Sequence, residues 1–227
     1  MNLQESSNPS RRPMYAEDAR VVSAGGNARV LRNTYALLAL SMLPTGLGNL
    51  LTGGLGLVVF FVGAFGLIWA IEKNRNSAAA VPLLLGFTFF MGLMLSRLVG
   101  MVLGLANGTG LVMMAFAGTA TIFFGMAALS SIIKRDLSTM GKWLFIGAVM
   151  LMVAGIANVF IQSSALMITM SVMAIGIFSA FVLHDLKRVQ DGLETNYVIA
   201  TLGVYLSLYN VFQNLLAILG IFGGRDE

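Results

Sequence analysis

The chain has no cysteine among its 227 residues and only one histidine, His184. Without cysteine, the fold contains no disulfide, and no thiol serves as a nucleophile or as a ligand for zinc or an iron–sulfur cluster. A lone histidine has no second histidine at ligand spacing, so the sequence predicts no metal site. The glycine-rich, serine-hydrolase and zinc-protease motifs of common enzymes are also missing, so we expect neither a cofactor nor an enzyme.

Charge is scarce as well, since 11% of the residues are charged and 57% are hydrophobic. A typical soluble domain is about 25% charged, and 24 charges cannot cover a water-exposed surface of this size. The high hydrophobicity excludes disorder for most of the chain. The apolar runs are continuous rather than alternating, which excludes a β-barrel. The composition therefore predicts an all-α polytopic membrane protein.

Residues 1–32 lack any apolar run, and five arginines lie among their serines, asparagines and glycines. A cleaved signal peptide needs an apolar segment before its cleavage site, so this stretch is not one. Its composition is typical of a flexible tail.

Seven apolar segments follow the tail, and each is long enough for a helix that crosses a bilayer. They cover about residues 33–51, 55–71, 81–104, 110–133, 142–161, 165–184 and 196–222. We therefore predict a seven-helix transmembrane domain over residues 33–224 and a short C-terminus at 225–227.

Basic residues occur in every second connection, as expected if lysine and arginine collect on the cytoplasmic side of the membrane. Twelve of the fourteen lysines and arginines fall in the tail and in the second, fourth and sixth connections. The other turns, at 52–54, 105–109 and 162–164, contain none. The tail is thus expected in the cytoplasm and the C-terminus in the periplasm.

Arg97 is the only charged residue in the stretch 81–133, about 16 residues or 24 Å into the third predicted span. One interpretation is that its long side chain reaches the outer membrane interface. The other is that it faces the interior as a pore-lining or gating cation.

Polar residues form a stripe on the last predicted helix, where Ser207, Asn210 and Asn214 share one face. Lipid does not solvate amides, so this face should point into the bundle. Asn158 and Gln162 of the fifth helix are candidates to meet it. Such groups serve either as hydrogen-bonding contacts between helices or as the lining of a hydrated cavity.

Asp185 ends the sixth predicted helix at the charged border of the membrane. It is either an interfacial charge that pairs with Arg188 three residues later or a titratable gate. His184 stands next to it.

Several segments resemble the Bax-inhibitor-type family of seven-helix membrane proteins and, within it, the bacterial YccA branch. They are VLRNTYALLAL (30–40), GTATIFFGMAALSSIIKRDLSTMGKWLFIG (118–147), GIANVFIQ (155–162) and ETNYVIATLGVYLSLYNVFQNLLAILG (194–220). The resemblance covers nearly the whole chain after residue 29.

The resemblance implies a bacterial inner-membrane protein that associates with the AAA protease FtsH as substrate and modulator. The flexible tail favours this function, because an ATP-driven protease needs a flexible segment on which to start. The rival implied function is a calcium or proton leak channel, gated in other family members by two aspartates on the last two helices. Asp185 matches the first aspartate, whereas Ser207 replaces the second. One carboxylate facing a hydroxyl cannot share a proton as two do, so this departure weighs against gating by a pair. A structural membrane protein is the third possibility.

Overall fold

The computed structural model describes residues 56–223, and every described element is an α-helix. The predicted tail (1–32), the first predicted span (33–51) and residues 224–227 lie outside this part of the chain. A helix is present at each of the remaining six predicted spans. The helices are α2 (Gly56–Lys73), α3 (Ala80–Leu103), α4 (Gly108–Ile132), α5 (Ser138–Ile161), α6 (Ser164–Gln190) and α7 (Tyr197–Gly223).

Five of these helices, α3 to α7, are long and apolar enough to cross a membrane within the part of the chain that was described. All but two helix ends fall within two residues of the predicted ones. The exceptions are the start of α5, four residues early, and the end of α6, six residues late. At 27 residues α6 is about 40 Å long, which exceeds the roughly 30 Å of the hydrocarbon layer.

The extra turns of α6 are stabilised by their own charges. Lys187 Nζ lies 2.6 Å from Asp191 Oδ1 one turn later, and basic residues in the last turn complement the helix dipole. At the other end, the Ser163 hydroxyl caps α6 by accepting a hydrogen bond from the Leu166 N–H at 3.3 Å. The charged residues therefore mark the end of the apolar segment of α6, and the helix continues past that point to Gln190.

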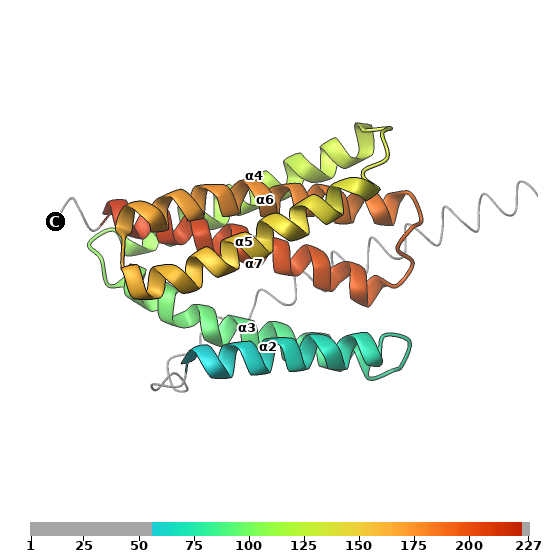
Figure 1. The fold of residues 1–227 in the computed structure, drawn as a ribbon, viewed down its shortest axis with the longest axis horizontal. Coiled ribbons are helices and arrows are strands. Elements are labelled where there is room, and N and C mark those ends of the chain that lie inside the picture. The colour runs from blue at the N-terminus through green and yellow to red at the C-terminus, as the bar shows by residue number, and fades with distance from the viewer. Residues whose placement is uncertain (1–55, 224–227) are drawn as a thin grey trace, which may run out of the picture.

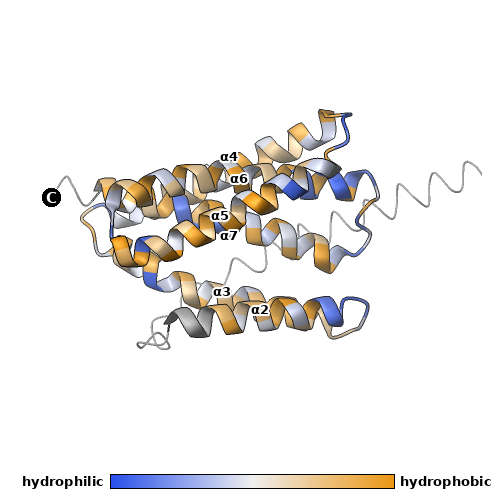
Figure 2. Cartoon of the chain, in the orientation of Figure 1, coloured by the Kyte–Doolittle hydropathy of each residue, from blue (hydrophilic) through white to orange (hydrophobic). Residues whose placement is uncertain are grey.

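The helix α7 is central, because it packs against α3, α4 and α6 (Figure 1). Two helices are peripheral: α5 packs on the outer side of α6, and α2 packs on α3. Apolar residues cover the helices along most of their length, as expected for segments that face lipid (Figure 2).

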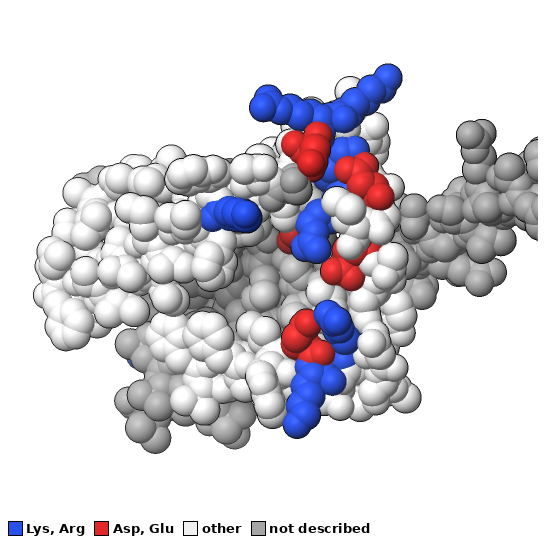
Figure 3. Space-filling view, turned by 45° about the vertical axis from the view of Figure 1, so that its right-hand side comes forward, with Lys and Arg blue, Asp and Glu red and all other residues white. Residues whose placement is uncertain are grey.

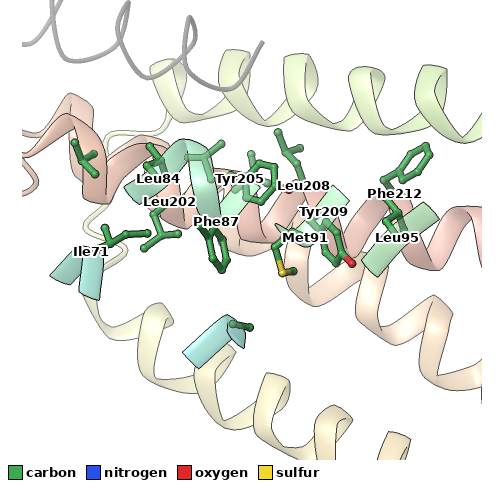
Figure 4. Packing of buried hydrophobic residues seen from close by; sticks show 14 of the residues in the cluster. Ile71, Leu84, Phe87, Met91, Leu95, Leu202, Tyr205, Leu208, Tyr209 and Phe212 are labelled. Carbon is green, nitrogen blue, oxygen red and sulfur yellow. The ribbon is translucent and has the colours of Figure 1, made fainter. Parts of the chain in front are cut away.

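Buried side chains of α3 and α7 form the centre of the core (Figure 4). The rings of Phe87 and Tyr205 meet edge to face with centroids 6.0 Å apart. The Tyr205 hydroxyl donates a hydrogen bond to the Thr88 carbonyl oxygen at 3.3 Å. Further along α7, Phe212 packs on Phe116 of α4 at 4.5 Å. These contacts fix α7 against two neighbours.

Charged side chains gather at one end of the bundle (Figure 3). This end contains the α2–α3, α4–α5 and α6–α7 connections (Figure 1), and we call it the charged end. Of the charged residues between 56 and 223, Arg97 alone belongs to none of these connections or the helix turns that adjoin them.

Side-chain hydrogen bonds join the connections of the charged end. Asn196 caps α7 by accepting from the backbone N–H groups of Val198 and Ile199 at 3.0 and 3.2 Å. Its amide nitrogen also donates to the Arg75 carbonyl oxygen in the α2–α3 connection at 2.7 Å. Gln190 similarly joins the end of α6 to that of α4, as it donates to Ser130 Oγ at 2.8 Å.

Candidate functional site

Asp185 lies between α6 and α7 at the charged end, with 19% of its side chain exposed. Its Oδ1 atom is 3.1 Å from the Nδ1 atom of His184. Its Oδ2 atom faces α7 at Gly203, where a Cβ added to the glycine would lie only 2.8 Å from that oxygen. The carboxylate therefore fits against α7 because residue 203 has no side chain.

His184 is buried and connects the same site to a third helix. A Cβ added at Gly141 of α5 would lie 2.7 Å from the His184 Nε2 atom. Successive residues of a helix point about 100° apart, so the pair reaches α5 on one side of α6 and α7 on the other. The sequence showed His184 only as a lone histidine beside Asp185, unsuited to a metal site. Nothing in the sequence marks Gly141 and Gly203 as the neighbours of this pair.

One of the two interpretations of Asp185, an interfacial charge paired with Arg188, does not match the structure. Arg188 NH2 instead lies 3.8 Å from Glu194 Oε2, and Asp185 contacts His184. The reason is helix geometry: Asp185 points toward α7, whereas the side chain of Arg188 is 43% exposed and reaches the α6–α7 connection.

Ser207 lies in the same neighbourhood as Asp185, because both adjoin Gly203. The buried Ser207 hydroxyl donates to the Gly203 carbonyl oxygen at 3.1 Å, one turn earlier on α7. The structure thus brings Asp185 of α6 to the turn of α7 that contains Gly203 and Ser207. Gly203 is the residue that lies directly against the carboxylate.

The asparagines of the polar stripe bond to their own helix. Asn210 donates to the Leu206 carbonyl oxygen and Asn214 to the Asn210 carbonyl oxygen, both at 2.8 Å. Each carbonyl has a second lone pair that accepts such a bond without opening the helix. Local bonds therefore engage these amide donors, where the sequence suggested bonds between helices or contact with water.

Asn158 lies at the opposite end of the bundle from Asp185. Its amide oxygen accepts a hydrogen bond from the Ser163 N–H at 3.0 Å in the α5–α6 turn, next to the exposed Gln162. The helix on which α5 packs is α6 rather than α7, so the structure does not bring Asn158 to the polar stripe. Arg97 is exposed on α3, six residues before that helix ends, and it does not join the site either.

The site that remains consists of one carboxylate and one imidazole, held between three helices. The pair connects α6 to α5 at Gly141 and to α7 at Gly203. Among residues 56–223, no three histidine, aspartate or glutamate side chains come together as metal ligands.

These features define an all-helical polytopic membrane protein. Residues 27–224 match the family described as inhibitor of apoptosis-promoting Bax1. The chain belongs to this Bax-inhibitor family, which confirms the resemblance seen in its sequence.

Similarity to bacterial relatives extends over most of the chain. The modulator of FtsH protease YccA from Escherichia coli K12 is 36% identical over 203 residues, which cover 87% of this chain and 92% of the relative. The inner membrane protein YccA of Escherichia coli O6:H1 matches to the same extent. An uncharacterized membrane protein of Vibrio cholerae is 30% identical over 94% of this chain and 99% of its own length.

Proposed function

We propose that this protein binds and modulates an FtsH-type protease of the bacterial inner membrane, and that it catalyses no reaction itself. The observation that carries the proposal is the 36% identity to the Escherichia coli modulator of FtsH protease over 92% of that relative. A match over nearly the full length of both chains means that they share their connections as well as their spans.

The positive-inside rule places the charged end in the cytoplasm, because the described basic residues other than Arg97 lie there. With seven spans, the N-terminus would then be cytoplasmic and the C-terminus periplasmic. Both the arginine-containing tail and the connections of the charged end, which the hydrogen bonds of Gln190 and Asn196 join, would face a cytoplasmic partner. This orientation gives the protease access to the tail, on which unfolding would start.

The test is co-purification from native membranes in mild detergent, with the protein tagged and the protease proteolytically inactive so that it cannot consume its partner. We expect recovery of the protease with the full chain. With active protease in proteoliposomes, the protein should also change the degradation rate of a second membrane substrate. A variant lacking residues 2–28 should insert normally and have a longer half-life in cells. Failure to recover the protease would contradict the proposal.

A cation leak is the second candidate, and the position of Asp185 between α6 and α7 is the observation that favours it. The substitution Asp185→Asn separates the two functions because it keeps the size of the side chain and removes its charge. A leak pathway predicts a lower calcium flux into liposomes. A protease partner predicts unchanged co-purification, because this carboxylate lies between helices. Asp191→Asn, at an exposed carboxylate just beyond the end of the same helix, is the matched control.

A further inference from the structure

Three exposed basic side chains lie around the α4–α5 connection, with Lys134 and Arg135 in the connection itself and Lys142 near the start of α5. None of the three forms an ion pair within the described part of the chain. The only acidic residue between them is Asp136, so the connection has a net positive charge. We call these three residues the basic corner.

The other connections of the charged end neutralise their charges internally. Each of the basic residues Arg75, Lys187 and Arg188 has a carboxylate partner within 4 Å. The pairs are Arg75 with Glu72 at 2.8 Å, Lys187 with Asp191 at 2.6 Å, and Arg188 with Glu194 at 3.8 Å. Lys73 lies 4.8 Å above the ring of Trp69. The basic corner is therefore the part of this end whose positive charge is available to a ligand.

The corner also lies at the rim of the bundle, where lipid surrounds the protein. None of the residues in the most apolar stretch of α5 is buried. In the most apolar stretch of α4, only 11% of the residues are buried. Apolar side chains flank the corner on both helices, with Ile132 72% exposed and Trp143 70% exposed. An exposed tryptophan beside basic residues is typical of the level where acyl chains meet headgroups.

We propose that Lys134, Arg135 and Lys142 bind the phosphate headgroups of anionic phospholipids. An arginine fork and two lysine ammonium groups suit phosphate oxygens, and basic residues at a membrane surface attract anionic lipid. The flanking apolar side chains favour a lipid over a soluble acidic protein, because the same ligand then contacts Trp143 with its acyl chains. This inference does not depend on a protease partner.

Trp143 provides the reporter for the test, because the chain has only two tryptophans. The full chain with Trp69→Phe is reconstituted into phosphatidylcholine vesicles with 20 mol% phosphatidylglycerol. Bromine atoms, which quench tryptophan, are placed on the upper acyl chain of one lipid or the other. We expect the ratio of phosphatidylglycerol to phosphatidylcholine around Trp143 to exceed the bulk ratio about five-fold or more, since each nearby basic residue contributes a factor of that order.

The variant Lys134→Gln/Arg135→Gln/Lys142→Gln should lose this enrichment. The matched control, Arg75→Gln/Lys187→Gln/Arg188→Gln, removes the same number of positive charges from the same end, but from residues that have partners. It should keep the enrichment. All three corner residues are exposed, so an unchanged helical circular dichroism spectrum is expected and shows that the variant is folded.

Three results would overturn the proposal. The first is quenching of the parent protein in proportion to the bulk fractions of the two lipids, which would mean no enrichment around Trp143 and would leave the corner to an acidic protein partner. The second is an equal loss of the enrichment in both triple variants, which would mean that the total positive charge of the charged end attracts the lipid, rather than the basic corner. The third is reversal of the enrichment by 10 mM glycerol phosphate, which would mean that the corner binds free phosphate esters.

Discussion

The substitution Gly203→Ala tests whether Asp185 packs against α7 as the structure shows. The new Cβ would lie 3.4 Å from Asp185 Cγ and only 2.8 Å from its Oδ2 atom, and the second distance is closer than van der Waals contact allows. Asp185 has a short side chain that His184 already engages, so it cannot move without weakening that contact. Overpacking of this kind costs about 1–3 kcal/mol, and the better helix propensity of alanine offsets roughly 1 kcal/mol. We expect a net destabilisation of up to about 2 kcal/mol.

A double-mutant cycle isolates the contact between the two helices. In an Asp185→Ala background the obstructing carboxylate is gone, so Gly203→Ala should become neutral or stabilise by up to about 1 kcal/mol. The coupling energy between the two positions is then about 2 kcal/mol. Gly176→Ala on α6 is the control, because nothing lies within 4 Å of a Cβ at that residue.

The assay is thermal unfolding of the purified protein in one detergent at one concentration. For a chain of this size, 1 kcal/mol corresponds to about 2–4 °C in Tm. Gly203→Ala should therefore lower Tm by several degrees, and Gly176→Ala should not. If the two alanines behave alike, or if Gly203→Ala costs the same with and without Asp185, the packing argument is refuted.

Two further predictions concern the connections. Asn196→Ala removes the cap of α7 and the bond to the α2–α3 connection, so it should destabilise by about 1–2 kcal/mol in the same thermal assay. Asn196→Asp keeps the capping oxygen and should recover part of that loss, whereas equal costs for both variants would contradict a capping role. Because the chain has no cysteine, single cysteines at Ser77 and Leu193 should react with a membrane-impermeant thiol reagent from one side of the membrane, and those at Asn107 and Ser164 from the other. Labelling of Ser77→Cys and Leu193→Cys only after permeabilisation would place the charged end in the cytoplasm, and a mixed pattern would contradict the helix order.

The helices themselves could be predicted from sequence, because crossing a bilayer is a local property. A span needs about 20 apolar residues whatever its neighbours are, and charged residues interrupt the runs between spans. The predicted end of α6 at residue 184 was too early for the same reason. Hydropathy locates the membrane boundary, while pairing of Lys187 with Asp191 lets the helix continue into water.

The candidate site could be predicted only in part. Asp185 was identified because a carboxylate next to an apolar run is rare in sequence. Its contact with His184 was not predicted, because Arg188 at i+3 and His184 at i−1 are both close to Asp185 along the chain. The choice between them depends on the direction in which α7 approaches α6.

The sequence by itself determined the class of protein, the positions of the six described helices to within a few residues, and the collection of charge at one end. Only the tertiary structure decided that His184 and Asp185 fit between Gly141 and Gly203, and that Asn210 and Asn214 bond to their own helix. Apart from the polar stripe of α7, these helices are apolar on nearly every side, so their sequences do not mark which face meets a neighbour. That information exists only once the helices are packed together.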